Sequence, residues 1–177
     1  MSIRGPDPSP GRRKVAAVAA MMGAALLAAA PVPPELGSGW ATFSRDDWGR
    51  QTKTRVEVGT IGFDRGARRL DFWLRRSMTR GVGHQEEVSW ADTRTCAPAR
   101  AVLASIRDIP VPRFAPVGTS KGPPLVTDGV AYALSTYSDD GGLSENTNLG
   151  TPLAAWIDGA LATLDRCWSS RVPERTR

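Results

Sequence analysis

The chain has 177 residues, of which 41% are hydrophobic and 23% charged, and it carries a formal net charge of +5. This length suits one domain and leaves little room for a second. The apolar and charged fractions are ordinary for a globular protein, so the composition excludes a fibrous or wholly disordered chain.

The first thirty residues have the layout of a secretory signal peptide. Four basic residues precede an apolar run from Val15 to Ala30, and this run ends in three alanines. Its 16 residues are few for a membrane-spanning helix, which needs about 20. We predict cleavage near Ala30 and export to the periplasm or the medium. The alternative is that the run is retained as a membrane anchor.

Export changes the meaning of the net charge. Residues 1–30 hold four basic side chains and one acid, Asp7, and therefore carry +3 of the total of +5. The rest of the chain is close to neutral, at +2. Because a basic surface for nucleic acid must belong to the folded domain, nucleic acid is not expected as a partner.

Cys96 and Cys167 are the only cysteines. Disulfides persist in an oxidising compartment, and two cysteines in an exported domain predict one bridge between them. A bridge that closes about 70 residues stabilises the fold by roughly 4 kcal/mol in the chain-entropy model. Two free thiols or a redox pair are the alternatives, although no Cys-x-x-Cys motif is present.

The first half of the exported chain is predicted to form strands. Residues 31–39 are rich in Pro and Gly and indicate a disordered or extended spacer. Apolar residues then alternate with a period of two in four segments, at 40–45, 54–59, 68–76 and 85–91. Glycines fill the connections, and short connections favour an antiparallel meander.

Two later segments have the apolar spacing of amphipathic helices. The first runs from Ala97 to Asp108 and ends before two prolines. The second follows Thr151, a favourable N-cap, and ends at Trp168. Gly159 inside this helix costs up to about 1 kcal/mol relative to Ala. A close contact between helix and sheet at that position would explain why a glycine is present there.

The remaining segments are turns and loops. Residues 111–124 are rich in Pro and Gly and predict an irregular connection. Asp128-Gly129 between alternating residues at 125–138 predicts a two-residue hairpin turn. Residues 139–150 indicate a polar loop, and residues 169–177 a polar, frayed tail.

These elements predict an α+β fold in the order ββββ-α-ββ-α. We expect an antiparallel sheet of five to six strands, two amphipathic helices on one face of it, and one disulfide. A single domain is expected at 40–168, between the spacer and the tail.

The signals for catalysis are weak. A literal G-x-S-x-G pattern spans 118–122 and contains Ser120, but prolines flank it where a nucleophile elbow needs a strand and a helix. A small secreted hydrolase would combine Ser120 with His84, the only histidine, and an acid from Glu86, Glu87 or Asp92. This hydrolase is an alternative interpretation, and no catalytic residue is assigned.

The signals for a metal are equally weak. Oxygen-bearing side chains crowd the segment from Asp139 to Asn148, and Ca²⁺ prefers such ligands. Their spacing is not that of an EF-hand, so a solvated polar loop is the favoured interpretation. We expect neither a cofactor nor a bound metal.

Arginines gather around the third predicted strand. Arg69, Trp73 and Arg75 share one face of it, and Arg and Trp are enriched at binding hot spots. Pairing with acids across the sheet is the alternative role for these arginines. Our leading hypothesis is an exported, non-catalytic domain that binds an unknown protein or an anionic envelope component through this face. A membrane-tethered structural protein remains a further alternative.

Overall fold

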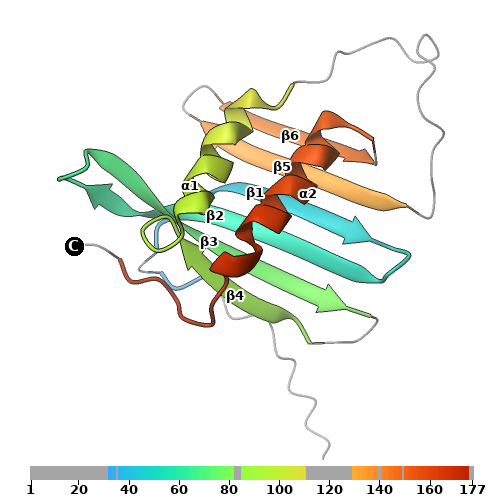
Figure 1. The fold of residues 1–177 in the computed structure, drawn as a ribbon, viewed down its shortest axis with the longest axis horizontal. Coiled ribbons are helices and arrows are strands. Elements are labelled where there is room, and N and C mark those ends of the chain that lie inside the picture. The colour runs from blue at the N-terminus through green and yellow to red at the C-terminus, as the bar shows by residue number, and fades with distance from the viewer. Residues whose placement is uncertain are drawn as a thin grey trace, which may run out of the picture.

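The computed structural model describes residues 32–34, 36–81, 85–110, 129–138, 141–148 and 150–175. Six strands form one antiparallel sheet in the order β4-β3-β2-β1-β5-β6 (Figure 1). The strands are β1 (Gly39–Asp47), β2 (Thr52–Asp64), β3 (Arg69–Arg80), β4 (Glu87–Asp92), β5 (Val130–Ser138) and β6 (Gly141–Asn148). The predicted α+β fold and the meander of the first four strands are confirmed.

Both helices lie on one face of the sheet, as expected (Figure 1). They are α1 (Ala97–Ala104) and α2 (Pro152–Leu164), and each continues into a short 3-10 helix, at Ser105–Asp108 and Asp165–Cys167. The hydroxyl of Thr151 accepts a hydrogen bond from the backbone N–H of Ala154 at 3.2 Å. Thr151 is therefore the N-cap of α2 that its sequence position predicts.

The main hydrophobic core lies between this face and the helices. Phe43, Val56, Leu74 and Leu134 project from β1, β2, β3 and β5, and each is at most 2% exposed. Ile157 of α2 belongs to the same cluster and is 0% exposed. The apolar alternation of the strands and the apolar stripe of the helix thus meet in one layer.

The predicted disulfide between Cys96 and Cys167 is confirmed, with the two Cα atoms 5.6 Å apart. Cys96 is the N-cap of α1, and Cys167 ends the 3-10 helix that follows α2. The bridge ties the start of one helix to the end of the other. Since the chain has no other cysteine, no free thiol remains.

Residues 141–148 differ from the prediction of a polar loop. They form β6, the outermost strand, which pairs antiparallel with β5. Most residues of β6 are exposed, because the strand lies at the sheet edge and far from the main core. A strand with two solvated faces needs no apolar alternation, so its sequence resembles a loop. The turn predicted at Asp128-Gly129 lies largely outside the described residues.

The second face of the sheet is partly covered by the N-terminal segment. Leu36 is 5% exposed and packs with Ile61 and Trp73 in a separate hydrophobic cluster. The indole N–H of Trp73 donates a hydrogen bond to the carbonyl of Gly37 at 3.2 Å. The described part of the spacer predicted at 31–39 therefore packs against this face of the sheet.

The first residue of the predicted tail is also held in place. Ser169 forms an isolated antiparallel bridge with Trp90 of β4, the strand at the other sheet edge. Its backbone accepts from the Trp90 N–H at 2.7 Å and donates to the Trp90 carbonyl at 2.9 Å. The packed structure therefore extends past the predicted domain boundary at residue 168.

Candidate functional site

The three residues of the predicted binding face differ in their exposure to solvent. Arg69, Trp73 and Arg75 do alternate along β3, but Trp73 is 1% and Arg75 6% exposed. A guanidinium nitrogen of Arg75 lies 3.3 Å from the Glu57 carboxylate on β2, as the alternative of cross-strand pairing predicts. Only Arg69 is exposed. Trp73 and Arg75 are therefore buried in this structure, because the N-terminal segment and neighbouring strands cover them.

Arg69 belongs instead to a projecting hairpin. β1 pairs with β2 only as far as Gly59, and β4 pairs with β3 only as far as Trp73. Beyond these residues β2 and β3 pair with each other alone, up to Asp64 opposite Arg69. This end of the hairpin extends past the rest of the sheet (Figure 1).

The exposed side chains at this end form the tip patch. Its members are Phe63, Arg65, Arg68, Arg69 and Leu70. Phe63 is 53% and Leu70 46% exposed, and the two lie opposite each other across the strands. Three arginines against one acid, Asp64, make residues 63–70 net +2. Exposed apolar groups beside an excess of arginines are typical of interaction surfaces.

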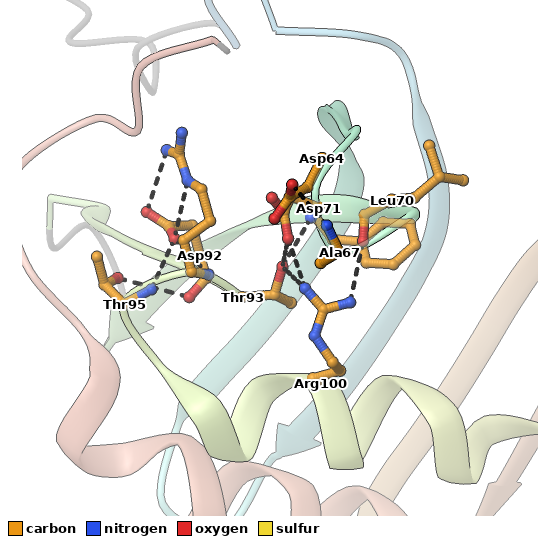
Figure 2. Close-up of polar contacts among 10 residues, drawn as sticks. Asp64, Ala67, Leu70, Asp71, Asp92, Thr93, Thr95 and Arg100 are labelled. Carbon is orange, nitrogen blue, oxygen red and sulfur yellow. Dashed lines mark hydrogen bonds and ion pairs between the residues drawn. The ribbon is translucent and has the colours of Figure 1, made fainter.

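The turn that carries the arginines has a defined shape. The Asp64 carboxylate accepts a hydrogen bond from the backbone N–H of Ala67 at 3.0 Å (Figure 2). This bond, together with one from Gly66, holds the pKa of Asp64 below its usual value. Arg68 adopts a left-handed backbone, with φ of 51°. The side-chain bond therefore fixes a tight turn that presents Arg65 and Arg68 outward.

A polar network anchors the hairpin to α1. The guanidinium of Arg100 donates to the Leu70 carbonyl at 2.9 Å and to the carboxylate of Asp71 (Figure 2). It also donates to the Thr93 hydroxyl at 3.1 Å, and that hydroxyl donates to Asp71 at 3.3 Å. Asp71 is 3% exposed, so its charge is compensated inside the protein. The network holds the base of the tip patch against the helix layer.

Asp92 is one of the acids that a small secreted hydrolase could use, and it has a structural role next to this network. Its carboxylate accepts backbone N–H bonds from Arg94 at 2.7 Å and from Thr95 at 3.0 Å (Figure 2). Burial alone would raise the pKa of Asp92, but these bonds and the Arg94 side chain lower it. A stabilised carboxylate of this kind is a poor general acid or base near neutral pH. His84 and Ser120 lie outside the described residues.

A cleft of about 810 Å³ opens beside the disulfide. Its lining includes Asp92 and Arg94, together with Arg171 and Glu174 of the C-terminal segment. Arg171 and Glu174 form an ion pair at 2.7 Å, and Arg94 pairs with Asp92 at 3.4 Å. Arg166 lines the same cleft, so its lining carries three arginines against two acids, a net charge of +1.

Tyr132 belongs to a second polar cluster, under α2. Its hydroxyl donates to the Asp158 carboxylate at 2.8 Å, and Arg45 lies 3.2 Å from the same carboxylate. Burial raises the pKa of Tyr132, the hydrogen bond with Arg45 opposes this, and the bond to Asp158 adds to the increase. The three side chains link β5, β1 and α2, so the cluster joins the sheet to the helix.

Within the described residues no three Asp, Glu, His or Cys side chains are grouped so as to hold a metal ion. Asp139 and Asp140, of the polar segment considered as a possible calcium site, lie outside that part of the chain. Glu145 and Asn146 follow each other on β6 and therefore point to opposite faces of the sheet.

No helix within the described ranges is long and apolar enough to cross a membrane. The chain matches no protein-family model, and no curated protein or solved structure is significantly similar to it. The tip patch must therefore be interpreted from its own chemistry. The signal in the sequence was the cluster D-R-G-A-R-R between Phe63 and Leu70, which marks an arginine-rich turn bounded by apolar residues.

Proposed function

We propose that this protein is an exported, non-catalytic domain that binds an anionic component of the envelope or medium through the tip patch. The observation that supports this is the joint exposure of three arginines and two apolar side chains on one projecting hairpin. Within the described residues, none of Arg65, Arg68 and Arg69 lies within ion-pair distance of a carboxylate. Their donors are therefore available to an external anion.

The rigidity of the hairpin base favours binding as its role. Arg100 joins the hairpin to α1 through Leu70 and Asp71, and Asp64 shapes the turn. A surface that is ordered before binding loses less conformational entropy on association. The disulfide between Cys96 and Cys167 is compatible with export, since such bridges persist in oxidising compartments.

The test is affinity for a sulfated polysaccharide, heparin, used as a generic anionic probe. The tip variant carries Arg65→Gln, Arg68→Gln and Arg69→Gln. The control variant carries Arg50→Gln, Arg107→Gln and Arg166→Gln, three exposed arginines outside the patch. Both variants have the same net charge, so a difference between them reports position rather than total charge.

We expect the tip variant to elute from heparin at clearly lower salt than the control variant. Equal elution of the two would contradict the proposal that the tip patch is the binding surface. Export is tested separately by the intact mass of the protein recovered after expression in a secreting host. A mass that begins near residue 31 supports cleavage, and a mass that begins at Met1 contradicts it.

A further inference from the structure

The apolar members of the tip patch narrow the kind of anion that fits it. We infer that the tip patch docks on an anionic lipid surface, an inference that rests on the proposed function. Phe63 and Leu70 are cross-strand partners and are 53% and 46% exposed at the projecting end of the hairpin. An anionic polymer would contact the arginines only. Phe63 and Leu70 would then stay exposed to water, which is unfavourable in free energy for apolar side chains.

The dimensions of the patch also favour lipid over a folded protein partner. A stable protein interface buries about 800 Å² on each partner, and needs a matching shape. Beyond Gly59 and Trp73, the hairpin has no strand neighbour on either side, so it offers a narrow end rather than a broad face. A lipid surface requires no matching shape, and apolar side chains enter it to a depth of only about 5–10 Å.

The chemistry of the five side chains fits the boundary between headgroups and acyl chains. Phe63 and Leu70 would enter the acyl boundary, while Arg65, Arg68 and Arg69 would extend to the phosphates. Long arginine side chains place their stems on apolar surface and their charged ends in the headgroup layer. The guanidinium fork also matches the geometry of a phosphate.

The path of the chain agrees with this orientation. Leu36, near the start of the described chain, packs with Ile61, two residues before Phe63. The described chain therefore enters the fold at the base of the same hairpin. The apolar run predicted to direct export comes just before this entry point, at Val15 to Ala30. Only a short segment therefore separates this run from the base of the hairpin.

The experiment is flotation of the exported protein with vesicles of phosphatidylcholine, with and without 30% phosphatidylglycerol. The first variant is the triple arginine change of the tip, and the second carries Phe63→Ser and Leu70→Ser. Trp48→Ser is the control for the apolar change, because Trp48 is 61% exposed in the turn at the opposite end of β2. The Arg50, Arg107 and Arg166 variant is the control for charge. All variants have the same N-terminal segment, so any vesicle binding by that segment is the same in each and cancels in the comparison.

We expect binding to the anionic vesicles and at least tenfold weaker binding to phosphatidylcholine alone. Loss of three arginines should weaken partition about a hundredfold, at roughly fivefold for each. The Phe63 and Leu70 change should weaken it at least tenfold, and the two controls should change it by less than threefold. Unchanged melting temperatures exclude misfolding of the variants as the cause.

Wild-type protein that does not bind anionic vesicles would overturn the lipid inference. Equal losses in the tip and control variants would overturn it as well. If heparin affinity depends on the tip patch while vesicle binding is absent, the proposal of an anionic partner is supported and the inference of a lipid surface is contradicted. If neither probe depends on the tip patch, both the proposed function and this inference fail.

Discussion

The indole ring of Trp73 lies directly over the backbone of Gly59. The two residues are opposite each other on β3 and β2. A Cβ atom placed on Gly59 would come within 2.3 Å of the indole carbons. Because the indole N–H also donates to the Gly37 carbonyl, the ring is held between the sheet and the N-terminal segment. Trp73 can occupy this position only because residue 59 has no side chain.

Gly59→Ala should therefore lower the free energy of unfolding by about 2–3 kcal/mol, as overpacking of a filled site does. Urea denaturation followed by tryptophan fluorescence measures this loss. The matched control is Gly159→Ala in α2, where no atom lies within 4 Å of an added Cβ. This openness corrects the expectation of a close helix–sheet contact at Gly159. The control should be stabilising, by up to about 1 kcal/mol, and equal effects of the two changes would contradict the packing described for Trp73.

Removal of the disulfide should have the largest effect on stability. Cys96 and Cys167 are 71 residues apart in sequence, and a double change to serine should lower the free energy of unfolding by about 4 kcal/mol. Urea denaturation of the oxidised wild type and of the double variant measures the difference. Wild type treated with a reductant should unfold at the same urea concentration as the variant. A difference below about 1 kcal/mol would show that the bridge constrains the unfolded chain very little.

Arg100→Met should loosen the base of the projecting hairpin. The change leaves the buried Asp71 carboxylate with Thr93 alone and removes the bond to the Leu70 carbonyl. We expect a loss of about 2–3 kcal/mol, less than for a fully buried pair because the Arg100 side chain is 29% exposed. Hydrogen exchange should accelerate at the backbone amides of residues 61–72.

The control for this change is Arg107→Met, in the 3-10 helix that follows α1. The Arg107 side chain is 82% exposed and, among the described residues, pairs only with its neighbour Asp108. Stability should change by less than about 0.5 kcal/mol. Unchanged hydrogen exchange in the Arg100 variant would mean that the hairpin base is held without the network.

The stability contributed by Asp92 should depend on pH. Hydrogen bonds from Arg94 and Thr95 lower the pKa of Asp92 in the folded state, against the effect of burial. A carboxyl group with a lowered pKa stabilises the fold above its unfolded pKa of about 3.9. That contribution is lost as the pH falls through the lower, folded value. Asp92→Asn should therefore destabilise the protein at pH 7 and much less at pH 2–3.

Urea denaturation of wild type and Asp92→Asn across this pH range gives the difference in unfolding free energy. Other acids with a lowered pKa, such as Asp47 and Asp64, are present in both proteins and cancel in the difference. The control Asp108→Asn changes an exposed acid and should have little effect at any pH. A difference for Asp92 that does not vary with pH would contradict the role of its charge.

Local patterns in the sequence were sufficient for most of the fold. The alternation of Leu70, Phe72 and Leu74 with Arg69 and Trp73 correctly predicted the two faces of β3. The Thr151 cap located the start of α2, and the count of two cysteines predicted the bridge. These features succeed because an alternating strand, a cap and a cysteine count depend on residues close in sequence or on composition.

The burial of Trp73 and Arg75 in the predicted binding face could not be predicted from the sequence, because it depends on contacts with residues far away in the chain. Trp73 is covered by the segment around Gly37, and 36 residues separate the two. Arg75 is paired with Glu57 on another strand, 18 residues away. Neither contact leaves a trace in the alternation of β3, which looks the same whether its second face is solvated or covered.

The sequence by itself determined the first five strands and both helices but not β6, that the chain has one disulfide, and that arginines gather between Phe63 and Leu70. Only the tertiary structure decided which of these side chains reach solvent. β1 stops pairing with β2 at Gly59 and β4 stops pairing with β3 at Trp73, so the hairpin end is left without strand neighbours. Exposure follows from where neighbouring strands and the N-terminal segment end, and these ends are set by packing between residues far apart in the chain.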